Sequence, residues 1–327
     1  MNKIANLPAN QRAELFSETA ARKGIGPAII EKDFWVCWTL GRLFKSKDIS
    51  QKILFKGGTS LSKVFNLIER FSEDIDLILN WNEVTLDNPQ TKRSRTKQDQ
   101  FNKQILDKGR IYLKNHLLPK LSDILGDLCT VDIPNDTPEV INVRYPASFS
   151  ENYLRPEIRL EIGPLALWCP NAQYNITPYA AEEFPALFEN ESCQIQAVTA
   201  ERTFWEKATI LHHEANRPLE NPQPVRYSRH YYDMARMAES PVKNNALARL
   251  DLLESVVQFK DKFYPRGWAK YNQAVPGTFR LIPDQQLITE LKKDYHQMQV
   301  MIFGKIPSFD QIIEILTNLE NQINMKV

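Results

Sequence analysis

The 327-residue chain is poor in cysteine and glycine, and it carries no excess of either charge. Its four cysteines lie far apart and form no CxxC pair, which argues against a zinc site and a disulfide-stapled fold. Only 11 glycines exclude a collagen-like or Gly-linker protein. The 41 basic and 40 acidic residues leave a net charge of +1, so any nucleic-acid site must be a local patch.

Long hydrophobic runs are also missing. The densest run, residues 34–38, is far too short to span a bilayer, and the first residues contain no apolar block of signal-peptide length. We therefore expect no membrane association and a cytoplasmic location with reduced thiols. Hydrophobic residues make up 43% of the chain and charged residues 25%, which is ordinary globular usage, and the length favours about two domains.

Hydrophobic periodicity predicts a mixed α/β first part and a mainly helical second part. Strands are expected at 52–56, 74–79, 128–133, 139–145 and 155–162. Helices are expected at 8–22, 27–45, 60–69, 98–118, 199–216, 228–239, 245–260, 284–302 and 308–324. The stretch 164–194 is rich in Pro, Asn and Tyr, which indicates loop with short elements. We expect an α+β fold with a mixed sheet and flanking helices over 1–198, and a helical domain over 199–327 that completes the cleft.

A tight glycine turn follows the first predicted strand. Gly57 and Gly58 let the backbone approach a ligand closely. Thr59 and Ser60 then begin a helix, where unpaired N–H groups and the helix dipole favour an anion such as phosphate. The alternative is a plain Gly turn with a Ser/Thr cap. The turn is not a Walker A loop, because GxxxxGK[ST] does not fit.

Two aspartates on the next predicted strand point to metal chemistry. Asp74 and Asp76 are two residues apart, so their side chains face the same way on a strand. Adjacent carboxylates repel each other unless a cation lies between them. Mg²⁺ is commonly held by a few carboxylates together with substrate phosphates. A DxD pair is often only a solvated face, but one that follows a Gly-Gly-Thr turn by a single helix favours a nucleotide site.

A third acid is needed for a two-metal phosphoryl-transfer site. The predicted strand at 155–162 alternates, with Glu157, Arg159 and Glu161 on one face. We expect Glu161 to be the third carboxylate, with the other two side chains nearby. An exposed edge strand carrying a Glu–Arg pair is the alternative.

The segments GGTSLSK and RFSEDIDL, between residues 57 and 77, resemble the AbiEii/MenT family of nucleotidyltransferase toxins. That family belongs to the DNA polymerase β-like nucleotidyltransferase superfamily. The segment EKDFW at 31–35 is similar to an upstream family motif, and Glu206-Lys207 followed by Arg229 and Asp233 is similar to its ExK…RxxxD region. FYPRGWAKY at 263–271 and DYHQM at 294–298 extend the resemblance over most of the chain. Gly58-Thr59 replaces the Gly-Ser of the wider superfamily, as is common in the AbiEii family.

The resemblance implies roles for individual residues. The residues expected to bind the nucleotide are Gly57, Gly58, Thr59, Ser60, Lys63, Arg70 and Ser72. The residues expected to bind Mg²⁺ or Mn²⁺ are Asp74, Asp76 and Glu161, which with Lys207 and Asp233 form the catalytic set. Several of these have a plainer alternative: Lys63 as a solvated helix lysine, Arg70 as a partner of Glu73, and Ser72 as a turn cap.

Lys207 and Asp233 have a chemical rationale of their own. Lys207 would stabilise the charge on a leaving pyrophosphate. Asp233 would orient it, or pair with an arginine such as Arg229. The alternative is a salt bridge between two helices.

The function implied is a metal-dependent transfer of NMP from an NTP to an acceptor, as the toxin of a toxin–antitoxin or phage-defence system with a separately encoded antitoxin. The tRNA 3′ end is the acceptor that the resemblance suggests. Transfer to a protein or small molecule, and a non-catalytic nucleotide- or RNA-binding module, remain alternatives. A tRNA acceptor would need local positive charge, for which the candidates are Lys92, Arg93, Arg95, Lys97, Arg266 and Lys270, the last two close to Trp268.

Overall fold

The computed structural model describes residues 1–72, 74–151 and 154–326, and it divides into two compact units. The first unit comprises Met1–Val64 and Phe71–Val198. The second comprises Thr199–Val327 together with Phe65–Arg70. The segment Phe65–Arg70 therefore leaves the first unit between the glycine turn and the DxD strand, and it packs with the helical part of the chain.

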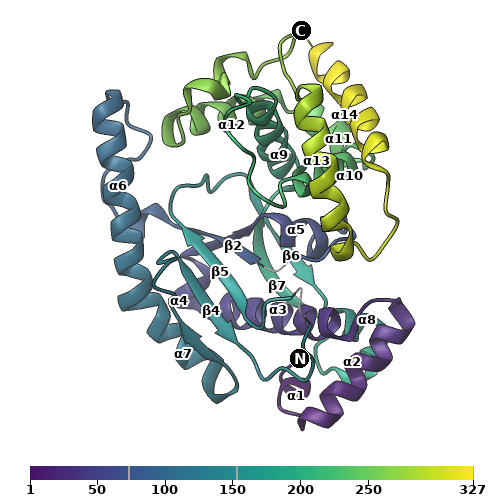
Figure 1. Ribbon diagram of the computed structural model, residues 1–327. Helices are drawn as coiled ribbons and strands as arrows, with labels where there is room; N and C mark the ends of the chain where they lie inside the picture. The colour runs from purple at the N-terminus through teal and green to yellow at the C-terminus, as the bar shows by residue number, and fades with distance from the viewer. Residues whose placement is uncertain (73, 152–153, 327) are drawn as a thin grey trace. The chain divides into compact units, whose positions relative to one another are not determined.

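A seven-stranded sheet forms the centre of the first unit, in the order β3-β4-β5-β2-β1-β7-β6 (Figure 1). Its strands are β1 (Ile53–Lys56), β2 (Asp74–Leu79), β3 (Thr130–Asp132), β4 (Val140–Arg144), β5 (Ile158–Gly163), β6 (Asn171–Ile176) and β7 (Cys193–Val198). The pairs β2–β5 and β1–β7 are parallel and the remaining pairs are antiparallel. The predicted α+β class with a mixed sheet and flanking helices is confirmed.

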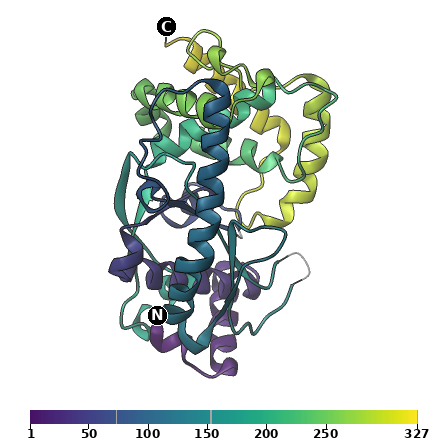
Figure 2. The same ribbon diagram turned by 90° about the vertical axis from the view of Figure 1, so that its left-hand side faces the viewer.

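The helices of the first unit surround this sheet. They are α1 (Asn2–Ala5), α2 (Ala9–Lys23), α3 (Pro27–Lys45), α4 (Lys47–Ser50), α5 (Gly58–Lys63), α6 (Arg95–Tyr112), α7 (Leu118–Leu125) and α8 (Tyr179–Glu183). Helix α3 begins at Pro27, where proline's fixed φ suits a first helical position, and it buries Trp35 and Trp38. Helix α6 is the long blue helix that faces the viewer in Figure 2.

Alternation along β2 and β5 separates an apolar face of the sheet from a polar one. Ile75 and Leu77 on β2, like Ile158 and Leu160 on β5, are buried. The residues between them are only partly buried and carry charge. A strand's side chains point alternately to opposite faces, so this pattern collects the acidic side chains of both strands on one face.

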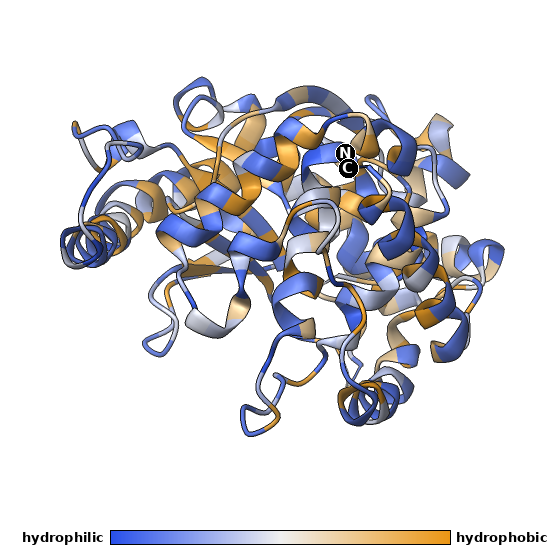
Figure 3. Ribbon diagram, turned by 90° about the horizontal axis from the view of Figure 1, so that it is seen from above, coloured by the Kyte–Doolittle hydropathy of each residue, from blue (hydrophilic) through white to orange (hydrophobic). Residues whose placement is uncertain are grey.

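The second unit is built from helices α9 (Ala200–Ala215), α10 (Ser228–Ala238), α11 (Val242–Leu247), α12 (Leu250–Phe263), α13 (Gln285–Met298) and α14 (Phe309–Asn324). Helix α14 buries a stripe at helical spacing: Phe309, Ile312, Leu316, Leu319 and Ile323. A capping box between Ser308 and Gln311 begins it. Figure 3 shows helices that carry both hydrophilic and hydrophobic residues, as one buried stripe per helix requires.

Two expectations from the sequence were wrong. The helix predicted at 60–69 ends at Lys63, because the apolar residues that complete its pattern belong to the second unit from Phe65 onwards. The stretch after residue 163 contains the strands β6 and β7, which the periodicity did not indicate. Among the described residues, no helix is long and apolar enough to cross a membrane.

Candidate functional site

The glycine turn and the DxD strand fit together at Gly57. Its φ of +85° lies in the left-handed region that favours glycine. A β-carbon at this position would meet Asp76 Oδ2 at 1.8 Å and Asp76 Cγ at 2.6 Å. Asp76 therefore lies directly against the backbone of the turn, in space that only a glycine leaves open.

The two hydroxyl groups after the turn hold the local structure. Thr59 Oγ1 donates a hydrogen bond to the backbone carbonyl of Asp74, and Ser60 Oγ donates to the carbonyl of Gly57 at 2.7 Å. Both side chains are buried. These bonds tie the start of α5 to β2 and fix the turn beside the two aspartates.

Register places the predicted acidic triad on neighbouring strands. Asp76 lies opposite Glu161 on the parallel strand β5 and opposite Lys56 on the antiparallel strand β1. Asp74 lies opposite Arg159. Side chains of directly paired residues share a face of the sheet, so the structure brings Asp74, Asp76 and Glu161 together on one face of the first unit.

Arg159 lies between two of these carboxylates. Its Nε is 3.4 Å from Asp74 Oδ1, and its Nη2 is 3.6 Å from Glu161 Oε1. Asp74 Oδ1 is buried and accepts no hydrogen bond. The guanidinium thus neutralises the acidic face by proximity rather than by well-formed hydrogen bonds.

The donor set suits a magnesium ion in kind. Carboxylate oxygens are the ligands that Mg²⁺ prefers, and the buried Asp74 Oδ1 lacks a donor. Over residues 1–72, 74–151 and 154–326, however, no group of three or more His, Cys, Asp or Glu side chains is arranged so that it could hold a metal ion. Asp74 and Glu161 contact Arg159 instead, so binding a metal here requires these side chains to rearrange.

Lys63, predicted near the phosphates, is buried at the end of α5. Its Nζ is 2.7 Å from Asp33 Oδ1 and 3.8 Å from the ring centre of Tyr179. The backbone N–H of Tyr179 donates to Asp33 Oδ2 at 2.7 Å. Burial lowers the pKa of Lys63, but the Asp33 carboxylate outweighs it and holds that pKa above its usual value. The alternative of a solvated lysine is therefore wrong, because Lys63 joins α5 to α3.

Other members of the EKDFW segment also brace the first unit. The carboxylate of Glu31 accepts hydrogen bonds from the backbone N–H groups of Ser148 and Phe149. Lys32 Nζ donates to the carbonyl of Arg155 at 2.7 Å. These charged residues are buried, and each fixes a loop to α3.

In the second unit, Asp233 is the centre of an ionic cluster. Arg70 donates to both of its carboxylate oxygens, at 2.6 and 2.8 Å. Lys207 Nζ donates to Asp233 Oδ2 at 2.7 Å and contacts His230 Nδ1 at 3.2 Å. Asp233 is fully buried. Its partners are thus Arg70 and Lys207, and not the Arg229 suggested by the sequence; the predicted alternative pair of Arg70 with Glu73 involves a residue outside the described part of the chain.

The cluster carries a surplus of positive charge. Arg70 and Lys207 hold the pKa of Asp233 well below its usual value, so it is a carboxylate at neutral pH. Burial and the neighbouring Lys207 ammonium lower the pKa of His230 well below its usual value, so its ring is neutral. Two cations therefore face one anion, which is an environment that favours a further negative group.

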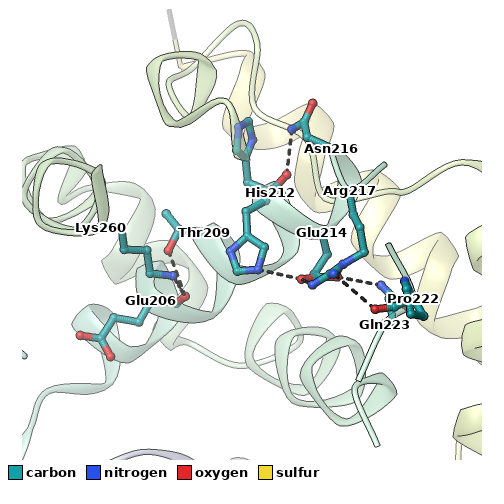
Figure 4. A network of polar contacts seen from close by, with 10 residues as sticks. Glu206, Thr209, His212, Glu214, Asn216, Arg217, Pro222, Gln223 and Lys260 are labelled. Carbon is teal, nitrogen blue, oxygen red and sulfur yellow. Dashed lines mark hydrogen bonds and ion pairs between the residues drawn. The ribbon is translucent and has the colours of Figure 1, made fainter. Parts of the chain in front are cut away.

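A polar network on α9 anchors the chain that leads into α10 (Figure 4). The buried Glu214 accepts two hydrogen bonds from Arg217, at 2.6 and 2.7 Å, and one from Gln223 at 3.0 Å. His213, Arg217 and Gln223 lower the pKa of Glu214 to about 2, in spite of its burial. The network closes the loop from Arg217 to Gln223, which precedes the helix carrying Asp233.

The predicted basic residues differ in their availability. Lys92, Arg95 and Lys97 are exposed. Arg93 is partly buried, because its guanidinium lies 3.7 Å from the ring centre of Phe101 and donates to backbone carbonyls of the preceding turn. In the second unit, Arg266 lies over the Trp268 ring at 5.5 Å, and Lys270 is exposed.

The family model described as "Nucleotidyl transferase AbiEii toxin, Type IV TA system" matches residues 38–315. The chain belongs to this family. It is therefore a member of a family of nucleotidyltransferase toxins, and the resemblance seen in its motifs is confirmed. Among solved structures, it is similar to the MenT4 nucleotidyltransferase toxin of Mycobacterium tuberculosis H37Rv, at 14% identity and a TM-score of 0.44, over 95% of this chain and 98% of that chain. No curated protein sequence matches it significantly.

The predicted site residues of this AbiEii family member thus form two groups. The glycine turn, Ser72, Lys63 and the acidic triad belong to the first unit, whereas Arg70, Lys207 and Asp233 belong to the second. Sequence reasoning missed two partners, Asp33 of Lys63 and His230 of Lys207. His230 precedes Asp233 by three residues, a spacing that puts both on one helix face and could have indicated their shared role.

Proposed function

We propose that this family member transfers a nucleoside monophosphate from an NTP to an acceptor, on the sheet face that carries Asp74, Asp76 and Glu161. The observation that supports this most is their register. Three carboxylates lie on paired positions of adjacent strands, and one of them fills the space beside a left-handed glycine. Such crowded negative charge destabilises a fold unless cations compensate it, so its retention favours a role in binding a cation and phosphates.

Asp74, Asp76 and Glu161 would hold Mg²⁺ or Mn²⁺. When bound, the metal would supply positive charge to the transferred phosphoryl group and orient it. The chain's own groups do the rest. The backbone from Gly57 to Ser60 would hold the phosphates, and Asp76 would keep the turn in place. Lys207, with its third N–H uncommitted to Asp233 or His230, would offer a donor to the leaving pyrophosphate.

The acceptor we propose is the 3′ end of a tRNA. The net charge of +1 means that attraction of a polyanion depends on local patches, for which Lys92, Arg95 and Lys97 are exposed. A separately encoded antitoxin follows from the family's type IV toxin–antitoxin description. A protein or small-molecule acceptor is the alternative if RNA is not labelled.

The test incubates the purified chain with each α-labelled NTP, Mg²⁺ and total cellular RNA, and measures label in RNA, protein and small molecules. We expect labelled RNA of tRNA size, abolished by EDTA. Asp74→Ala should abolish the transfer while the far-ultraviolet circular dichroism stays unchanged. Arg144→Met, on a neighbouring strand, is the matched control, because it contacts Asp132 and Glu157 rather than the triad. Full activity of Asp74→Ala would contradict the proposal.

A further inference from the structure

We propose that Arg159 is a two-position counter-cation, which occupies the acidic face in the metal-free protein and moves to Asn142 when a divalent cation binds. The inference rests on the proposed function, since it names a residue that regulates metal binding at that site. It concerns how the chain manages the charge of its carboxylates when no substrate is bound.

The first position is the one in the structure. Arg159 lies 3.4 Å from Asp74 Oδ1 and 3.6 Å from Glu161 Oε1, and only 15% of its side chain is exposed. These two oxygens belong to residues predicted to bind the metal. One guanidinium therefore compensates the charge that the metal would otherwise compensate, and the two cations exclude each other from these oxygens.

The contacts at this position are loose enough to be released. Asp74 Oδ1 accepts no hydrogen bond, and 3.6 Å to Glu161 exceeds ordinary hydrogen-bond length. The pair of Arg70 and Asp233 shows what a committed arginine looks like, with two hydrogen bonds of 2.6 and 2.8 Å to one carboxylate. Arg159 forms no such fork with Asp74.

The second position lies on the other side of Arg159. Its register partner on β4 is Asn142, so the two side chains share a face of the sheet. Asn142 is 5% exposed, and its Nδ2 donates to Asp132 Oδ2 at 3.3 Å, which orients the amide. Its Oδ1 is buried and has no hydrogen-bond partner. A buried acceptor without a donor costs free energy, and a displaced guanidinium would satisfy it.

The geometry thus gives Arg159 an acceptor on each side, Asp74 on β2 and Asn142 on β4. In the metal-free protein the carboxylates outweigh the amide, because a charged acceptor attracts a guanidinium more strongly than a neutral one. When a divalent cation takes over the carboxylates, the balance reverses. Arg159 then moves by one strand and leaves Asp74 Oδ1 available.

The experiment measures Mn²⁺ affinity without nucleotide, from free Mn²⁺ by electron paramagnetic resonance. Arg159→Met should bind Mn²⁺ about fivefold more tightly, because a competing cation is gone. Asn142→Leu should bind it about threefold more weakly, because the displaced guanidinium loses its acceptor. In the double variant the Asn142 substitution should have no further effect. Arg144→Met, a neighbouring arginine on the same face, should match the wild type.

Unchanged or weaker Mn²⁺ binding in Arg159→Met would overturn the inference, as would an equal effect of Asn142→Leu in both backgrounds. Arg159→Lys provides a second variant, with affinity expected between those of the wild type and Arg159→Met, and urea unfolding shows that each variant is folded. Asp74→Asn separates the two proposals. If Mn²⁺ binding is lost in Asp74→Asn but unchanged in Arg159→Met, the metal site stands and only the role of Arg159 fails. If the wild type binds no Mn²⁺ through Asp74, both fail.

Discussion

The carboxylate of Asp76 occupies the space that a β-carbon at position 57 would need, with Oδ2 only 1.8 Å from that point. Gly57 is thus required twice, once by its φ of +85° and once by its contact with Asp76. The relationship joins the glycine turn to the DxD strand, and it makes a prediction about each requirement separately.

Gly57→Ala should abolish nucleotide transfer and lower the free energy of unfolding by about 2 kcal/mol, because it forces both backbone strain and displacement of Asp76. Gly126→Ala is the control, since Gly126 also has a positive φ of +62° but no atom within 4 Å of its added β-carbon. It should cost about 1 kcal/mol and leave activity intact. Equal effects of the two variants on activity would mean that the contact with Asp76 is unimportant.

Lys63→Met should destabilise the protein by about 3 kcal/mol in urea unfolding, because it leaves the Asp33 carboxylate buried without its cation. Combining it with Asp33→Asn should recover much of that loss. Lys103→Met removes an exposed pair with Asp99 and should change stability by less than about 0.5 kcal/mol. If the stable double variant binds NTP as the wild type does, Lys63 supports α5 rather than touching phosphate.

Lys207→Met should reduce kcat for nucleotide transfer by about a hundredfold or more, if its ammonium stabilises the leaving pyrophosphate. The fold should tolerate this change, since Asp233 keeps both hydrogen bonds from Arg70. Lys260→Met, which removes a hydrogen bond to the Glu206 carbonyl, is the control in the same unit. Wild-type turnover in Lys207→Met would identify the Lys207–Asp233 contact as a structural salt bridge between α9 and α10.

Replacing Lys92, Arg95 and Lys97 with Ser should weaken tRNA binding and flatten its dependence on salt. The log–log slope should fall by about 0.9 units for each phosphate that the protein no longer neutralises. Arg93→Ser is the contrasting variant, because Arg93 is engaged with Phe101 and the preceding turn. It should affect stability more than the slope. A salt slope unchanged by the triple substitution would exclude these residues from an RNA path.

His212 predicts a loss of stability at mildly acidic pH. Its Nδ1 accepts from the Arg280 backbone N–H at 3.0 Å and its Nε2 donates to the Lys270 carbonyl, so the buried ring is neutral. Burial lowers its pKa from 6.5 to about 4. Between these values the unfolded chain binds more protons, so stability is complete above pH 6.5 and falls by about 3 kcal/mol as the pH drops to 4.

The measurement is the free energy of unfolding of the wild type and of His212→Gln from pH 4 to pH 8. His213 and His230 also have lowered pKa values, so the difference between the two proteins isolates His212. The wild type should lose more stability than the variant as the pH falls. Parallel curves would contradict a neutral His212.

Sequence reasoning located those elements whose residues carry their own pattern. Pro27 and the apolar period define α3, and alternation at 74–79 defines β2 with its two aspartates on one face. It failed for β6, whose residues Asn171–Ile176 are mostly polar because it is an edge strand with little apolar surface to bury. A strand of this kind is specified by its partner β7 rather than by its own hydrophobicity.

The sequence by itself determined the family and the chemical character of the site, because the turn, the two aspartates and Glu161 are each legible in short local motifs. Only the tertiary structure decided the partners of the charged residues. Lys63 pairs with Asp33 across 30 positions, and Arg70 with Asp233 across 163. An ion pair depends on which strands and helices become neighbours, and long-range packing sets that. The same holds for Arg159, whose position between Asp74 and Asn142 exists only once β4, β5 and β2 are in register.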